Sequence, residues 1–230
     1  MSRFVDITIR DLMACLTYDD LGGAIMNLAE RLGYDYCGFE WSPGGAQLGT
    51  PGYEGSAASN YPKAWLDRWT KQNYIDHDPV YAFSLAGEGV RTWTALPQDT
   101  PEAKTMMADA AHHGLEAGLV AAYPEMEGGR FTLILGGVEP VGDPEIASDA
   151  LPILLPLIAA QYRRAHRAEV VLARLTARER TVLLELEKGN RRVDIAGTLN
   201  IHERSVDRHL QAIKKKFGAR TLHELVLNLK

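Results

Sequence analysis

The sequence predicts an α+β protein, with an N-terminal α/β/α sandwich domain over residues 1–165 and a C-terminal all-α domain over residues 174–230. Helical and strand-like patterns alternate through the first part, whereas only helical patterns occur after residue 170. The net charge also changes sign between the two parts. A chain of 230 residues is long enough for two domains, and we expect residues 166–173 to link them.

Apolar residues recur at helical spacing over residues 19–32, which predicts an amphipathic helix that Gly33 ends. A later helix is expected to begin at Thr100 and Pro101, because proline is tolerated in the first helical turn, and to end at Gly114. The other elements expected in this domain are a strand over 34–41, a loop over 42–60, a helix over 61–72, strands over 90–96, 119–123 and 130–138, and a helix from 144 to about 167.

The C-terminal part predicts four helices and no strand. Thr176 and Glu179 fit a capping box, in which each side chain satisfies a free amide of the first turn. Gly189 ends that helix, and Asn200 occupies the turn before the third one. The expected helices cover 177–188, 191–198, 203–216 and 221–229.

The charge distribution indicates a possible nucleic-acid partner. Residues 1–162 carry 9 Lys and Arg against 22 Asp and Glu, whereas residues 170–230 carry 13 against 7. A phosphate backbone would be attracted only to the second part. The first residues contain no apolar segment of the kind found in secretory signals, so we expect no such signal, and no apolar run reaches the ~18 residues that a membrane span needs. Its two cysteines form no CxxC pair, so we expect a cytoplasmic protein.

The helix over 203–216 has two distinct faces. Its apolar residues must pack inward, while the opposite face presents cationic and amide side chains of the kind that bind guanine edges and phosphates. A solvated basic helix in an ordinary bundle would show the same pattern. The apolar stripe is Val206, Leu210, Ile213 and Phe217, and the polar stripe is Arg204, Arg208, Gln211 and Lys215, with Lys214 beside it.

Residues 175–220 resemble the helix-turn-helix of LuxR-type regulators. The resemblance implies that the third helix of the domain enters the DNA major groove, and that the fourth contributes to dimerisation. The matching residues are Leu175, Thr176, Arg178, Glu179, Leu183, Gly189, Ile195, Ala196, Leu199, Ile201, Val206, His209, Leu210, Ile213, Lys216, Gly218 and Arg220. The candidate DNA-contacting residues are Arg204, Ser205, Arg208, Gln211, Lys214 and Lys215.

Two residues of this segment depart from the family pattern. His202 stands where the family has a helix-capping serine, a change that costs about 1 kcal/mol of helix stability. Asp207 places an acid on the third helix, where it either disfavours some phosphate contacts or pairs with Arg204 or Lys214.

The N-terminal domain concentrates aromatic residues between positions 61 and 93. Tyr61, Trp65 and Trp69 share one helical face, and Asp78 and Trp93 follow. Aromatic rings with a few polar groups and one carboxylate are typical of a small-molecule pocket, although aromatic residues at helical spacing also form ordinary cores.

These residues, with Pro62, Pro79, Gly114, Leu115 and Gly118, resemble the autoinducer-binding domain of LuxR-type quorum-sensing receptors, whose ligand is an acyl-homoserine lactone. The resemblance covers most of residues 20–165. It implies that Trp65 donates to the lactone carbonyl, Asp78 accepts the amide N–H and Tyr61 bonds the acyl carbonyl, while Trp93 packs near the lactone ring. We expect Asp78 to be left unpaired without ligand, which would couple binding to folding.

Two further residues concern the acyl group. Trp69 replaces the usual tyrosine of the family on the wall near the acyl chain, which favours a short, branched or aryl acyl group. Thr132 offers a hydroxyl to the acyl carbonyl, and strand alternation places Leu133 and Leu135 on the opposite face.

The sequence thus predicts a homodimeric regulator that binds an acyl-homoserine lactone and a palindromic promoter site, with half-sites roughly 34–36 Å apart. The helix over 144–167 is the candidate dimer contact, provided that Pro152 and Pro156 lie at a kink or a free edge. We expect no catalytic group, metal or cofactor. The alternatives are an orphan regulator that answers another molecule or none, and an enzyme acting on acyl lactones.

Overall fold

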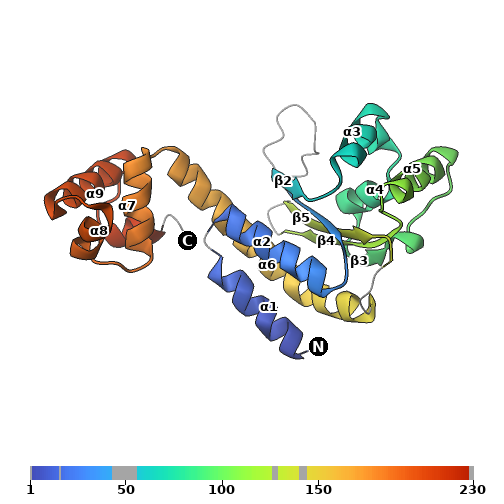
Figure 1. Ribbon diagram of the computed structural model, residues 1–230, viewed down its shortest axis with the longest axis horizontal. Helices are drawn as coiled ribbons and strands as arrows, with labels where there is room; N and C mark the ends of the chain where they lie inside the picture. The colour runs from blue at the N-terminus through green and yellow to red at the C-terminus, as the bar shows by residue number, and fades with distance from the viewer. Residues whose placement is uncertain (1, 16, 43–55, 126–128, 140–143, 228–230) are drawn as a thin grey trace. The chain divides into compact units, whose positions relative to one another are not determined.

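The computed structural model describes residues 2–15, 17–42, 56–125, 129–139 and 144–227 (Figure 1). The chain forms two compact units. The first combines Met1–Cys15 with Asp19–Tyr162, and the second combines Leu16–Tyr18 with Arg163–Lys230.

A five-stranded antiparallel sheet forms the centre of the first unit. Its strands lie in the order β2-β1-β5-β4-β3, with every neighbouring pair antiparallel. The strands are β1 (Tyr36–Ser42), β2 (Ser56–Ser59), β3 (Gly89–Thr92), β4 (Ala117–Pro124) and β5 (Arg130–Gly137).

One face of the sheet packs against α2 (Tyr18–Arg31) and α6 (Pro144–Ala173), with α1 (Ser2–Ala14) beside them (Figure 1). The ring of Tyr162 on α6 lies 5.8 Å from that of Phe39 and 5.6 Å from that of Phe131, between centroids. Cys37 Sγ is 3.0 Å from Met26 Sδ on α2. These contacts make the dry core that supports the opposite face.

The other face is covered by α3 (Lys63–Lys71), α4 (Pro79–Ala86) and α5 (Pro101–His112), together with the 3₁₀ turns η1 (Tyr74–Asp76) and η2 (Trp93–Ala95) (Figure 1). A second core cluster lies here and includes Trp65, Tyr74, Trp93, Met106 and Val120. The unit is therefore the α/β/α sandwich that the sequence predicts.

Several predicted boundaries need correction. The strand expected over 90–96 ends at Thr92, because the chain turns into η2 at Trp93. The loop expected over 42–60 contains β2 near its end, and its residues 43–55 lie outside the described part of the chain. Helices α1 and α4 were not predicted. The start of α5 is confirmed, since Thr100 Oγ1 accepts a hydrogen bond from Ala103 N at 3.1 Å.

Helix α6 is longer than expected. It continues to Ala173 through Pro152 and Pro156, so the segment expected to link the domains is helical up to that residue. Pro152 is exposed and Pro156 half-buried, which limits the cost of the backbone groups that each ring leaves without a helical partner. No helix in the described residues is long and apolar enough to cross a membrane.

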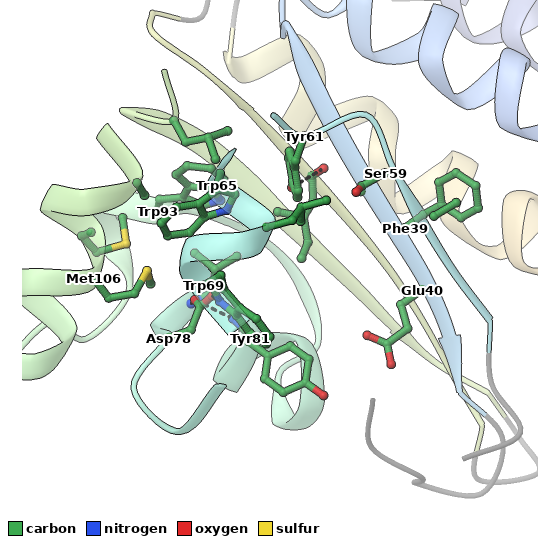
Figure 2. A pocket seen from close by; sticks show the side chains of 18 residues that line it. Phe39, Glu40, Ser59, Tyr61, Trp65, Trp69, Asp78, Tyr81, Trp93 and Met106 are labelled. Carbon is green, nitrogen blue, oxygen red and sulfur yellow. Dashed lines mark hydrogen bonds between the residues drawn. The ribbon is translucent and has the colours of Figure 1, made fainter. Parts of the chain in front are cut away.

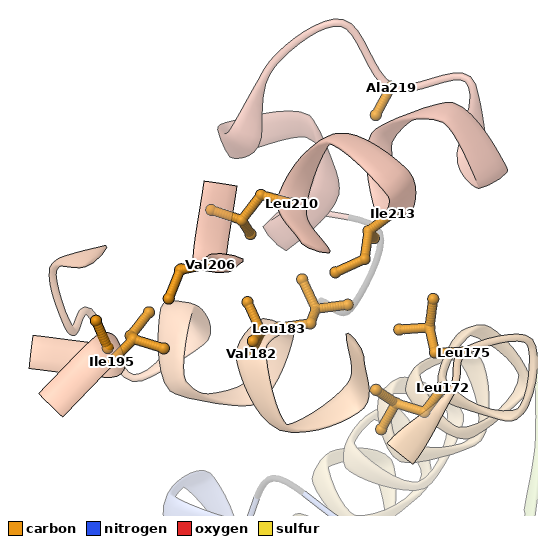
Figure 3. Packing of buried hydrophobic residues seen from close by; sticks show 10 residues of the cluster. Leu172, Leu175, Val182, Leu183, Ile195, Val206, Leu210, Ile213 and Ala219 are labelled. Atoms are coloured by element: carbon orange, nitrogen blue, oxygen red, sulfur yellow. The ribbon is translucent and has the colours of Figure 1, made fainter. Parts of the chain in front are cut away.

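The second unit is a small helical bundle built around α9 (Glu203–Phe217) (Figure 3). The stripe predicted to pack inward does so, except that Phe217 is half-buried. The other helices are α7 (Ala177–Glu187), α8 (Arg192–Leu199) and α10 (Leu222–Leu227). The core comprises Leu172, Leu175, Val182, Leu183, Ile195, Ala196, Val206, Leu210, Ile213 and Ala219.

The end of α6 belongs to this bundle. Leu172 is in its core, and Arg164 Nη2 lies 3.2 Å from Glu187 Oε1 on α7. The predicted capping box is present, since Thr176 Oγ1 accepts from Glu179 N at 3.3 Å and Glu179 Oε2 accepts from Thr176 N at 2.8 Å. Asn200 has the left-handed conformation expected at the turn, with φ of 51°.

Candidate functional sites: an aromatic cavity and an exposed basic helix

A cavity of about 280 Å³ lies between the sheet and the helices α3 to α5 (Figure 2). This volume is close to the lower end of the range for ligand pockets, roughly 300 Å³. Its walls are mostly aromatic and aliphatic, with a few polar groups. They comprise Gly38, Phe39, Glu40, Ala58, Ser59, Tyr61, Trp65, Leu66, Trp69, Asp78, Val80, Tyr81, Trp93, Met106, Met107, Ala110, Leu115 and Ile134. Five of the six residues predicted to bind ligand, namely Tyr61, Trp65, Trp69, Asp78 and Trp93, are among them.

Asp78 is held at the cavity wall by three hydrogen bonds. Its Oδ1 accepts from Val80 N at 2.8 Å and Tyr81 N at 3.0 Å, which caps α4. Its Oδ2 accepts from Trp69 Nε1 at 2.9 Å. Burial raises the pKa of Asp78, and these hydrogen bonds oppose the rise. The expectation that this carboxylate is unpaired without ligand is therefore wrong. A carboxylate offers about four acceptor positions, so one remains for a guest.

Trp93 lies across a pair of facing glycines on β4 and β5. Gly118 is opposite Gly136 in the sheet register. A Cβ atom on Gly118 would lie 2.4 Å from Trp93 Cε2, and one on Gly136 would lie 2.6 Å from Trp93 Cη2. The indole can therefore occupy this position only because both residues beneath it are glycines. Its buried Nε1 has no hydrogen-bond partner among the described residues. An unpaired buried donor costs about 1–3 kcal/mol, so a ligand acceptor that bonded to this N–H would remove that cost.

Trp65 and Tyr61 complete the aromatic end of the cavity. Trp65 is buried and stacks on Tyr74, with centroids 6.1 Å apart and planes at 28°. Tyr61 Oη donates to Ile134 O at 3.4 Å, a long bond that a better acceptor could replace. Burial raises the pKa of Tyr61 well above its ordinary value, so the hydroxyl remains a proton donor at neutral pH.

A polar contact fixes the outer side of this wall. The Tyr74 hydroxyl donates to Asp109 Oδ2 on α5, and Arg68 Nε on α3 donates to the same oxygen at 2.8 Å. Hydrogen bonds from both partners lower the pKa of Asp109. The contact ties α3, η1 and α5 together and thereby fixes the backbone on either side of Trp65.

Thr132 does not line the cavity. Its hydroxyl donates to Ser84 O on α4 at 3.3 Å, because α4 covers this part of β5. Ile134, two residues further along the strand, is the β5 residue that reaches the cavity. The predicted alternation is confirmed, since Leu133 and Leu135 are on the α6 side of the sheet with Phe131.

Sequence reasoning missed two groups of wall residues. Met106 and Ala110 lie at helical spacing on α5, with Met107 beside them. Their apolar periodicity could have identified them as a buried face, although not as cavity wall. Glu40 on β1 shares a face with Gly38 by strand alternation. An acid in the middle of an aromatic strand is the sequence signal that could have identified it.

Helix α9 presents the predicted DNA-contacting residues on its outer side. Arg204, Arg208, Gln211 and Lys215 are exposed, while Ser205 and Lys214 are half-buried. His202 precedes the helix without a capping side-chain hydrogen bond, as its departure from the family pattern predicts.

Asp207 on α9 has a partner that neither predicted alternative named. Its Oδ1 lies 3.3 Å from Arg192 Nε on α8, rather than beside Arg204 or Lys214. The pair joins the two helices of the helix-turn-helix on their solvent side and offsets the negative charge on α9.

An ion pair with one buried partner fixes the other end of α9. Lys216 Nζ lies 2.5 Å from Glu179 Oε2, and Glu179 is buried beneath the start of α7. The hydrogen bond from Lys216 lowers the pKa of Glu179, and the bonds from Thr176 lower it further. Lys216 therefore forms an ion pair within the bundle although much of its side chain is exposed, as is Lys215 beside it.

Comparison with known proteins agrees with this geometry in both units. Residues 17–165 match the autoinducer binding domain family, and residues 173–229 match the family of bacterial regulatory proteins of the luxR type. The transcriptional activator VanR of Vibrio anguillarum is 23% identical over 226 residues, which cover 95% of this chain and 92% of VanR.

Two solved structures share the fold. SdiA of Escherichia coli, in a complex with octanoyl-rac-glycerol, has a TM-score of 0.55 and 20% identity, with 99% of this chain and 93% of that chain covered. The LuxR-family factor CepR2 of Burkholderia cenocepacia, described as N-acylhomoserine lactone dependent, has a TM-score of 0.52 and 20% identity, with 70% and 92% covered. The chain therefore belongs to the LuxR family of transcription regulators, with an autoinducer-binding domain followed by a helix-turn-helix DNA-binding domain.

Proposed function

We propose that this protein is a cytoplasmic quorum-sensing regulator that binds an acyl-homoserine lactone in the aromatic cavity and thereby controls its binding to promoter DNA. The observation that carries the proposal is the convergence of Tyr61, Trp65, Trp69, Asp78 and Trp93 on one cavity. A lactone with an amide side arm offers two carbonyl oxygens and one ring oxygen to accept hydrogen bonds, and one N–H to donate.

The cavity has a group for each of these features. Trp65 would donate to the lactone carbonyl, and Tyr61 would exchange its long bond to Ile134 for the acyl carbonyl. Asp78 has one acceptor position left, which suits the single amide N–H of such a ligand. The unpaired Nε1 of Trp93 would gain from an acceptor nearby.

Ligand binding is expected to act through linkage. A guest that contacts α3, α4 and the sheet at once stabilises only the folded sensor, by an amount that rises with ligand concentration. The ordered sensor would then favour a homodimer in which two copies of α9 bind the half-sites of an imperfect palindrome.

Helix α6 offers a surface for that dimer. Ile146 and Ile153 are exposed by 39% and 53%, and with the half-buried Leu157 they follow the spacing of a helix-pairing stripe. Pro152 is beside this stripe on the solvent side, as a free edge requires.

The test is DNA binding measured with and without ligand. Promoter fragments selected with the full-length protein are titrated by fluorescence anisotropy in the presence of acyl-homoserine lactones, with octanoyl-rac-glycerol as a comparison because SdiA was solved with it. The proposal expects a lactone to change the DNA affinity, and no lactone to be hydrolysed. A response to the glycerol ester alone would identify a regulator that answers another molecule, and lactone turnover would identify an enzyme.

A further inference from the structure

A carboxylate lies on the cavity wall far from the two buried tryptophans. Figure 2 shows the Glu40 side chain pointing from β1 into the space beside Trp69 and Tyr81, whereas Trp65 and Trp93 are at the other end. Glu40 is half-buried, so its carboxylate is partly withdrawn from water even before a guest enters. The cavity therefore has an indole-rich end and an acidic end.

The surroundings of Glu40 determine which kind of ligand tail can bind at this end of the cavity. It pairs with Thr132 in the register of β1 and β5, and its neighbours along the wall include Tyr81, whose ring packs edge-on against Trp69 with centroids 6.0 Å apart. A hydrocarbon tail that filled this end would supply no donor for the acceptor positions that the contacts of Glu40 within the protein leave, and would keep water from them, which is costly. An ionised carboxylate can only accept hydrogen bonds.

We propose that the ligand has a hydroxyl group at the far end of its acyl chain and that Glu40 accepts a hydrogen bond from it. This inference rests on the proposed function, since the lactone end is assigned to Trp65 and Asp78. A carboxylate has about four acceptor positions, so contacts within the protein leave room for the ligand hydroxyl. Glu40 thereby selects hydroxylated acyl groups and rejects plain hydrocarbon tails of the same length.

The test compares two matched series of L-homoserine lactones, from hexanoyl to decanoyl, with and without a hydroxyl on the terminal carbon. Binding to the full-length protein is measured by calorimetry. A hydrogen bond to a charged group predicts that the best hydroxylated lactone binds about tenfold or more tightly than its unsubstituted counterpart.

Variants assign that preference to Glu40. Glu40→Leu should bind the unsubstituted lactone more tightly than the hydroxylated one, and Glu40→Gln, which retains an acceptor, should keep part of the original preference. Glu116→Leu, on the exposed turn before β4, is the matched control and should behave as the wild type.

Three results would overturn the inference. If the wild type binds both series equally, or if Glu40→Leu keeps the preference for the hydroxyl, Glu40 does not select the tail while the proposed function stands. If neither series binds at any length, the proposed function fails and takes this inference with it. Calorimetry therefore separates the two failures.

Discussion

The indole N–H of Trp69 donates to Asp78 Oδ2 at 2.9 Å, so the residue that departs from the family pattern also helps to hold the carboxylate of the cavity. Trp69 lies on α3, and Asp78 caps α4. The bond joins two helices of the cavity wall. It also occupies one acceptor position of the Asp78 carboxylate, which reduces the number left for a ligand.

Replacing Trp69 by phenylalanine keeps a ring but removes this donor. A hydrogen bond to a charged group contributes about 1.5–3 kcal/mol, so Trp69→Phe should lower the free energy of unfolding by an amount in this range. Because the bond lowers the pKa of Asp78, the variant should have a still higher pKa there.

The sign of the pH effect follows from that shift. A carboxyl group with a raised folded-state pKa favours folding most when protonated, so its contribution falls as pH rises above the ordinary value of 3.8. The deficit of Trp69→Phe relative to wild type should thus grow from about pH 4 to pH 7, as measured by urea unfolding. A constant deficit would mean that only ring packing was lost.

The facing glycines beneath Trp93 predict an overpacking effect. Gly136→Ala would place a Cβ 2.6 Å from Trp93 Cη2, so it should destabilise the sensor by about 1–3 kcal/mol. Combining it with Trp93→Phe should recover part of that loss in a double-mutant cycle monitored by thermal unfolding. Gly22→Ala on α2 is the control: nothing lies within 4 Å of its Cβ, and it should stabilise the protein by about 0.5–1 kcal/mol. Additive effects of Gly136→Ala and Trp93→Phe would disprove the contact.

The exposed side of α9 predicts which substitutions weaken DNA binding. Arg208→Ala should reduce affinity for a selected promoter fragment by about tenfold, since one base contact is worth about 1–3 kcal/mol. Lys104→Ala on α5 removes an exposed cation of the sensor and should leave the affinity unchanged. Both are measured by anisotropy at one salt concentration, with ligand uptake as a check on folding. Equal affinities for wild type and Arg208→Ala would exclude this face of α9 as the DNA-contacting surface.

The ion pair between Lys216 and Glu179 predicts a pH-dependent stability. Because the folded-state pKa of Glu179 is lowered, its contribution is present above the ordinary value of 4.5 and is lost as pH falls below it. Lys216→Met should therefore lower stability at pH 7, by about 1 kcal/mol since Lys216 is partly exposed, and less at pH 4. Lys215→Met should show no such dependence. A deficit that persists at pH 4 would point to packing of the lysine stem instead.

The sequence was sufficient for local patterns and insufficient for features made by tertiary contacts. Helical spacing identified the buried stripe of α9, and strand alternation placed Leu133 and Leu135 correctly. The strand expected through Trp93 failed because the chain turns there to lay the indole over Gly118 and Gly136, a relationship between distant residues.

Other errors have local causes. The pair of Asp78 and Pro79 is a helix start, with a capping acid and a proline in the first turn, and this local signal for α4 is absent from a prediction that treats Asp78 as a ligand group alone. The prediction that Thr132 binds ligand rests on its hydroxyl group alone, whereas its position under α4 determines that the hydroxyl bonds to Ser84 O. Glu40 required the register of β1 before its place in the cavity could be recognised.

The most direct test of the central claim is native mass spectrometry of the full-length protein after incubation with a mixture of acyl-homoserine lactones. The account predicts that one lactone is retained per chain and that Asp78→Asn and Trp65→Phe, although folded, retain much less. Retention of no lactone, or equal retention by the wild type and both variants, would contradict the assignment of the aromatic cavity as the autoinducer site.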